Sequence, residues 1–465
     1  MRDGIATIPA SLCQSSGTQI IISSLGDARA EYTIQLERMI STTAIPAPRR
    51  LDLIAAISPA EITSPAGLAQ ASTQTETVDS TASVTPSDQP VGTSSPKTAA
   101  FDLPTRITAD ADPAAYVRIQ AVTACQNRHA RVMLDREMAD QLPLQTAAQK
   151  IARYIDQQLI PRLPVEWGRC PDLDGDGRVT VLITPHVQRL NGGSEPLAGF
   201  TRPSDLDPGL APPFSNACDL IYLSSDLPHD EKLEAVLCHE YMHLLCIGWA
   251  AKTTAMPVAL QEEWLSEGIA HLGELHLSRS DGNVAHRLLA FGAHPDQSPL
   301  AVISSLAAGQ YRQPGSRGAT CSFLSYCQQR TGLEFVQQLA TATEPAREAL
   351  QRVTGSPFEQ LYRDWTVTLA MRQPVQTRGV ATPAATLAVD WRPALQWKKL
   401  AWGEASPALA SFRQRGTASS YWRTETAPSD VSDPLSALRS PGDVWRGALQ
   451  ISTSSAARLQ VTVIE

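Results

Sequence analysis

The stretch at residues 236–249, VLCHEYMHLLCIGW, carries the decisive pattern of this chain. His239 and His243 stand four residues apart, and Glu240 follows the first histidine directly. On a helix, residues i and i+4 share a face, so both imidazoles can reach one ion. Glu240 is turned about a third of the way round the helix, where it can take a proton from a polarised water. The alternative is an ordinary core helix whose histidines are satisfied by hydrogen bonds.

A third ligand separates these alternatives, because a catalytic zinc site needs three protein ligands and one open position. A histidine six residues after the second is one solution, but Trp249 occupies that place. The segment at 261–277, QEEWLSEGIAHLGELHL, offers Glu267, which is 24 residues after His243. Glu274 lies seven residues further, on the same helix face. The spacing allows Glu267 to ligate while Glu274 accepts a hydrogen bond from a ligand imidazole.

These segments resemble the gluzincin zinc metallopeptidases. They are more closely similar to the hyicolysin family of neutral zinc metallopeptidases, over roughly residues 145–330. The matching segments are PDLDGDGRVTVLIT (171–184), SNACDLIYLSS (215–225), CHEYMHLL (238–245) and EWLSEGIAHLGE (263–274).

The resemblance implies a zincin-like fold in which His239, His243 and Glu267 bind Zn²⁺ and Glu240 is the general base. The chain departs from the family pattern at two positions. Ser266 replaces the usual asparagine, and His271 stands where relatives often carry an acidic residue. We therefore expect Glu274 to supply the support for the ligands that this acidic residue would give.

The segment DLDGDG resembles the first half of a calcium-binding EF-hand loop, with Asp172, Asp174 and Asp176 at alternate positions and Gly177 sixth. The closing bidentate glutamate is missing, because the twelfth position is Ile183. A polar turn that leads into a strand is therefore favoured. A turn stabilised by Ca²⁺ is the alternative.

Hydrolysis of a peptide also needs a donor for the oxyanion. Tyr311 is the favoured candidate, since it lies in a predicted loop, GQYRQPGSRG, that could lean over a cleft. Spacing alone does not separate Tyr311 from the other candidates, which are Tyr326, His271, His276 and His286.

The chain divides by composition into four parts, and its catalytic part is predicted to be α+β because few strands precede many helices. The predicted parts are a small β-rich segment (1–57), a disordered Ser/Thr/Pro linker (58–100), a zincin-like domain (101–375) and a small β-sandwich-like domain (384–465). The predicted strands of the zincin-like part are 178–185 and 219–225. Its predicted helices are about 144–163, 230–248, 260–277, 283–291, 318–330, 333–341 and 356–371.

The composition narrows the class of protein. A net charge of -8 argues against nucleic-acid binding, and no apolar run reaches the length of a transmembrane helix. The eight cysteines form no CxxC pair, and Cys238 and Cys246 are expected in a core rather than at a metal. No signal peptide is visible, but the linker composition favours an extracellular or cell-envelope location. A cytoplasmic location stays open, and we expect a monomer.

The sequence thus predicts a zinc-dependent endopeptidase acting on proteins or peptides. The alternative from another class is a non-catalytic zinc-binding interaction protein derived from a peptidase domain. An aminopeptidase is less favoured, because the GxMEN motif of those enzymes is absent.

Overall fold

A computed structural model gives the fold of the 465-residue chain. The structure describes residues 5–9, 18–25, 31–40, 98–106, 112–190, 197–227, 231–253, 262–280, 282–300, 313–371, 395–401, 408–415, 418–425, 447–453 and 459–464. The predicted linker at 58–100 lies outside these residues except for its last three, which begin a strand.

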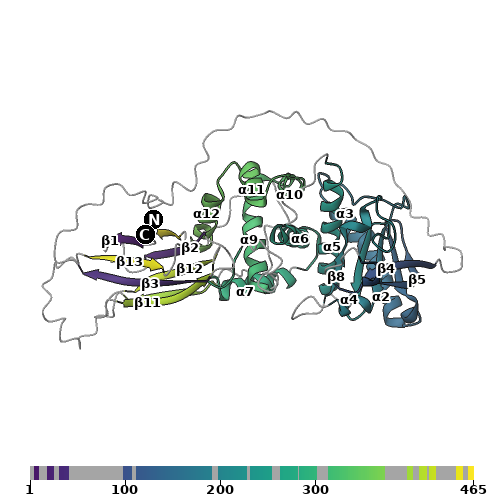
Figure 1. Cartoon of the computed structure of the whole chain (residues 1–465), viewed down its shortest axis with the longest axis horizontal. Helices are drawn as coiled ribbons and strands as arrows, with labels where there is room; N and C mark the ends of the chain where they lie inside the picture. The colour runs from purple at the N-terminus through teal and green to yellow at the C-terminus, as the bar shows by residue number, and fades with distance from the viewer. Residues whose placement is uncertain are drawn as a thin grey trace, which may run out of the picture.

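A six-stranded sheet forms one end of the molecule, at the right of Figure 1. The strand order is β4-β5-β6-β7-β9-β8, and the central strands β6, β7 and β9 run parallel. Every residue of β7 is buried, as expected for a parallel strand covered on both faces. The strands are β4 (Thr98–Pro104), β5 (Tyr116–Gln126), β6 (Ala130–Asp135), β7 (Val179–Thr184), β8 (Gly199–Thr201) and β9 (Leu220–Ser224).

Helices cover one face of this sheet. Alternate residues of β7, such as Val181 and Ile183, belong to the same core as α2 (Leu142–Tyr154) and α5 (Glu231–Ala250). After α2 the chain continues through a π-helical turn, η4 (Ile155–Leu159), into α3 (Ile160–Arg162). The opposite face packs into a smaller cluster around Leu182 of β7. The core side of α5 includes Cys238 and Cys246, which fits the expectation of buried cysteines.

The chain after α5 is mostly helical and fills the middle of the molecule in Figure 1. These helices are α6 (Glu263–Leu277), α7 (Gly282–Ala293), α9 (Pro314–Thr331), α10 (Glu334–Ala340), α11 (Ala346–Thr354) and α12 (Phe358–Met371). Shorter helical turns are η2 (Pro113–Ala115), η3 (Arg136–Met138), α4 (His186–Arg189) and η5 (Pro203–Leu206). The described chain therefore has the mixed α+β character that the sequence predicted. No helix within the described ranges has both the length and the apolar character needed to cross a bilayer.

Strands from the two ends of the chain form the remaining part, here called the terminal β region. Its two four-stranded sheets have the orders β1-β13-β3-β11 and β10-β12-β2-β14. The first strands are β1 (Ile5–Pro9), β2 (Gln19–Ser24) and β3 (Glu31–Ile40). The last strands are β10 (Trp397–Ala401), β11 (Ala408–Arg415), β12 (Ser419–Glu425), β13 (Gly447–Thr453) and β14 (Leu459–Ile464).

This pairing differs from the expectation of two separate β pieces. Strand β3 from the N-terminal segment lies between β13 and β11, and β2 lies between β12 and β14. A buried side-chain bond also links the sheets, because Gln414 Nε2 donates to the carbonyl of Ile22 at 3.0 Å. The purple and yellow strands at the left of Figure 1 show this mixture. A sequence pattern predicts where a strand lies but not which strand it pairs with. The expectation of two separate β pieces therefore followed from the order of the segments in the sequence alone.

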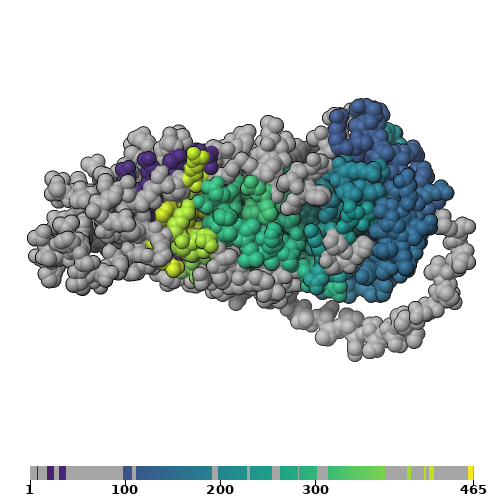
Figure 2. Space-filling model, turned by 90° about the horizontal axis from the view of Figure 1, so that it is seen from below, coloured from purple at the N-terminus to yellow at the C-terminus, as the bar shows by residue number. Residues whose placement is uncertain are grey.

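The terminal β region packs on the helical part. The hydroxyl groups of Tyr362 on α12 and Ser419 on β12 lie 3.0 Å apart, and Lys398 Nζ lies 2.6 Å from Asp296 Oδ2. In Figure 2 the yellow-green surface of this region adjoins the green helices, with the blue sheet region beyond them. The helices therefore lie between the two β parts of the molecule.

Candidate metal centre

Two packed helices carry the predicted site. Helix α5 holds His239, Glu240 and His243, and α6 holds Glu267 and Glu274. The two helices share one buried core, because both present apolar faces to it.

The start of α6 is fixed by Glu262, a residue that the sequence analysis did not single out. Its Oε2 accepts a bond from Trp264 Nε1 at 2.8 Å, and its Oε1 accepts from the backbone N–H of Ala346 at 2.7 Å. Ala346 is the first residue of α11. This bond joins the beginnings of α6 and α11, one turn before Glu267.

The structure brings the three predicted ligands together. His239 Nε2 lies 3.3 Å from both His243 Nε2 and Glu267 Oε2, and His243 Nε2 lies 3.6 Å from Glu267 Oε1. A tetrahedral Zn²⁺ with bonds of about 2.0–2.1 Å separates its ligand atoms by about 3.3 Å. The side chains of His239, His243 and Glu267 are 12%, 15% and 22% exposed, so the group is reachable from solvent. The residues therefore fit a zinc ion with an open position.

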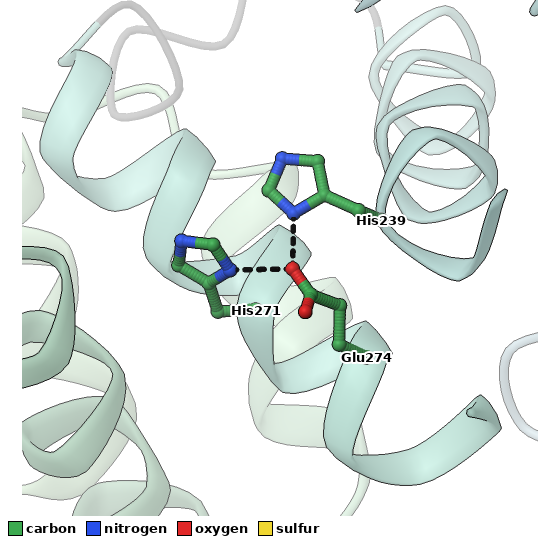
Figure 3. Close-up of side chains that lie close together, drawn as sticks. All are labelled: His239, His271 and Glu274. Atoms are coloured by element: carbon green, nitrogen blue, oxygen red, sulfur yellow. Dashed lines mark hydrogen bonds and ion pairs between the residues drawn. The ribbon is translucent and has the colours of Figure 1, made fainter. Parts of the chain in front are cut away.

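Glu274 fixes the orientation of the first histidine (Figure 3). Its Oε1 lies 2.8 Å from His239 Nδ1 and 2.6 Å from His271 Nδ1, and both imidazoles point at this oxygen. A proton on Nδ1 of His239 leaves the lone pair on Nε2, the atom beside Glu267. Separations of 2.6–2.8 Å suit hydrogen bonds and are short for two ligands of one ion. We therefore interpret His239, His271 and Glu274 as a hydrogen-bonded network that supports the ligands.

Helix α7 adds two further contacts to Glu274 that local motifs did not reveal. Asn283 Nδ2 donates to Glu274 Oε2 at 2.7 Å, and Arg287 Nη1 lies 4.0 Å from Oε1. Asn283 and Arg287 are four residues apart and so share a helix face. In the sequence, only this four-residue spacing relates Asn283 to Arg287. It does not predict that their helix face contacts Glu274.

Burial and nearby charges both shift the pKa values of this network. Burial lowers the pKa of His239, but the carboxylates of Glu267 and Glu274 raise it to about 10. Burial and the nearby Arg287 charge lower the pKa of His271 to about 3, so it donates to Glu274 as a neutral imidazole. Burial raises the pKa of Glu267, but Arg317 and the two histidines outweigh burial and hold the pKa well below its usual range.

Glu240 has the environment of a proton acceptor. It is only 6% exposed, and burial raises its pKa against the opposing effect of His239 and His243. A carboxylate with a raised pKa holds a proton more readily near neutral pH. The neighbouring charges that act on it include Glu267 and Glu274, so it lies in the field of the whole group.

The three aspartates of the loop lie close together, as the sequence suggested, and the positively charged side chain of Arg131 lies beside them. One ligand atom each of Asp172, Asp174 and Asp176 lies within 4.8 Å of the others. Arg131 on β6 pairs with Asp176, and its Nη1 lies 3.7 Å from Asp174 Oδ2. The guanidinium therefore neutralises part of the cluster. This arrangement agrees with a polar turn, and calcium binding stays a prediction.

The predicted oxyanion donor, Tyr311, lies outside the described residues. Two of the alternatives have structural partners instead. His276 is 4% exposed and its Nε2 lies 2.9 Å from Gln328 Oε1, while His271 is bound to Glu274. Tyr326 is also buried, at 4% exposure on α9.

The chain has only weak similarity to the known proteins it matches. No protein-family model matches the chain, and no curated protein matches it. Among solved structures, it is similar to an M1 zinc metallopeptidase from Deinococcus radiodurans, a mutant bound to a Tyr-Ser-Ala substrate. The identity is 13%, the match covers 65% of this chain and 61% of that one, and the TM-score is 0.28. The chain therefore matches about three-fifths of that structure.

Proposed function

We propose that this protein is a zinc-dependent peptidase of the gluzincin type, close to the hyicolysin-like enzymes. The observation that carries the proposal is the spacing of His239 Nε2, His243 Nε2 and the Glu267 carboxylate at 3.3–3.6 Å. Two histidines and a glutamate with an open position are a donor set of catalytic zinc sites. The adjacent Glu240 adds a base, which a purely structural zinc site does not need.

The bound Zn²⁺ would supply Lewis acidity that polarises water and the substrate carbonyl. The chain's own residues do the remaining work. His239, His243 and Glu267 would hold the ion, and Glu274 keeps His239 in the tautomer that offers Nε2. Glu240 would take a proton from the attacking water while the water oxygen forms a bond to the carbonyl carbon. It would then give that proton to the amine nitrogen as the C–N bond breaks.

The substrate would be an extended segment of a protein or peptide, cleaved internally. Strand β8 supports this choice, since it is at the edge of the six-stranded sheet and packs near α5. Among the described strands it pairs only with β9, so its other edge can accept an extended chain. An extracellular location and a monomeric state stay predictions.

The first test measures metal content and cleavage of casein by the purified protein, with and without a chelator. We expect about one zinc per chain, chelator-sensitive cleavage and restoration by added Zn²⁺. Cleavage that persists without metal would contradict the proposal. Bound zinc without any cleavage would favour the non-catalytic interaction protein.

The second test is Glu240→Gln, which keeps the size of the side chain but removes its basicity. We expect zinc content to be unchanged and the cleavage rate to fall by about 10²- to 10⁴-fold, the usual contribution of a general base. Glu231→Gln is the matched control, because Glu231 is an exposed glutamate on the same helix. Full cleavage by the Glu240→Gln variant would remove Glu240 from the mechanism.

A further inference from the structure

The guanidinium of Arg317 lies beside the candidate metal ligands. Arg317, near the start of α9, has its Nη2 3.4 Å from Glu267 Oε2. Its side chain is 20% exposed, close to the 22% of Glu267, so the pair is partly shielded from water. Arginine stays charged at any ordinary pH. The predicted ligand set therefore has a fixed positive charge next to its only carboxylate.

Backbone packing places this arginine. Gly268 follows Glu267 in α6, and a Cβ there would lie 2.5 Å from Thr320 Cγ2 on α9. Gly318 follows Arg317 in α9, and a Cβ there would lie 2.1 Å from the carbonyl oxygen of Arg287 on α7. Only glycine tolerates such approaches without movement of the neighbouring helix. The two glycines therefore let α9 lie close to α6 and α7 at the positions beside Glu267 and Arg317.

The guanidinium has two opposing effects on metal binding. It holds the Glu267 carboxylate in place, which favours binding by reducing the disorder of the ligand. It also repels a divalent cation and draws on the electron density of the carboxylate, which weakens binding. Because the site is partly shielded from water, the repulsion between the guanidinium and the ion is screened less than it would be at a free surface. The repulsive effect should therefore dominate.

We propose that Arg317 is a positioning residue that acts through Glu267 to weaken the hold of the site on its ion and keep that ion electrophilic. With two neutral imidazoles and one carboxylate, the ligands carry a charge of about -1. Arg317 adds one positive charge beside the Glu267 carboxylate. A ligand set that donates less charge leaves more positive charge on the metal for the substrate. The inference rests on the proposed function, because it requires that the site bind a divalent metal.

The experiment compares Arg317→Met, which removes the charge, with Arg317→Lys, which keeps it. The affinity of each metal-free protein for Zn²⁺ is measured by competition with a coloured chelator. Cleavage of casein by the zinc-loaded protein is measured in parallel. Arg330→Met is the matched control, because Arg330 lies at the far end of the same helix.

We expect Arg317→Met to bind Zn²⁺ about tenfold more tightly, because a positive charge near the ion is removed. Its kcat should fall about tenfold, within the range seen when a residue that contacts a metal ligand is lost. Arg317→Lys should stay within about threefold of the wild type in affinity, and Arg330→Met should not change. Arg317→Gln is a second neutral variant with the same expectation, in case the methionine variant does not fold.

Weaker or unchanged Zn²⁺ affinity in the neutral variants would overturn the inference. A weaker affinity would mean that Arg317 only supports the Glu267 carboxylate. An arginine that merely stabilises the fold cannot produce tighter binding on removal, so the sign of the change is decisive. A wild-type protein that binds no Zn²⁺ would overturn the proposed function itself, which is a distinguishable result.

Discussion

The paired helices α5 and α6 and the terminal β region are assembled in opposite ways. In the helix pair, the side chains of His239 and Glu267 meet across a separation of only 28 residues. In the terminal β region, Ser23 and Ser419 lie 2.9 Å apart across a separation of 396 residues. Short sequence motifs can therefore predict the helix pair. The terminal β region instead depends on which of many possible strand pairings forms.

The two regions also differ in the changes that they tolerate. The helix pair depends on a few polar side chains with fixed separations. The terminal β region depends on strands β2 and β3, which occupy internal positions in its two sheets. Loss of one polar group should impair the proposed chemistry of the helix pair, while loss of a whole segment should prevent folding of the terminal β region.

Deleting residues 1–40 should damage the protein most. This removes β1, β2 and β3, including the fully buried side chains of Ile21, Ile22 and Ile34. The strands that remain would expose apolar faces and open edges, so we expect aggregation or loss of strand content by circular dichroism. Supplying residues 1–57 as a separate chain with residues 58–465 should restore a complex that co-elutes in gel filtration. A stable, soluble protein lacking residues 1–40 would contradict these strand pairings.

An intermediate effect is expected for Asp219→Asn, at the residue just before β9 in the six-stranded sheet. Burial raises the pKa of Asp219 from 3.8 to about 8, and Oδ1 has no hydrogen-bond partner among the described residues. A carboxyl with a raised folded-state pKa stabilises the fold below its unfolded pKa and loses that contribution as pH rises through the folded value. The wild type should therefore lose stability between about pH 4 and pH 9, on the order of 5 kcal/mol at most.

The asparagine variant should lack this pH dependence and be the more stable protein at pH 9. Urea unfolding at several pH values measures the difference. Parallel curves for the two proteins would show that Asp219 ionises normally.

The smallest effect is expected for Tyr362→Phe, which tests the contact between the helices and the terminal β region. The Tyr362 hydroxyl lies 3.0 Å from Ser419 Oγ in a buried position. Its removal should cost about 1 kcal/mol, the usual net contribution of a buried hydrogen bond. Because the bond spans both parts, we expect their thermal transitions to separate slightly in calorimetry. An unchanged unfolding profile would show that the two parts are coupled by other contacts.

Elements with strong periodicity were predicted closely. The predicted helices at 230–248 and 260–277 correspond to α5 and α6, and the strands at 178–185 and 219–225 correspond to β7 and β9. Strands β4, β5 and β6 and helix α11 were not predicted. Strand β5 alternates only weakly, with just two buried residues in eleven, so its pattern does not stand out from a loop.

The candidate chemistry could be read from the order of residues: His239, Glu240 and His243 lie about one helical turn apart, and Glu267 follows on the next helix. This was possible because helical geometry converts spacing into direction. The surroundings of these residues were visible only after the chain had folded. Asn283 and Arg317 come from other helices, and the ends of the chain meet in shared sheets. Such contacts depend on how the surfaces of helices and strands fit together when they pack, and the local spacing of residues does not predict that fit.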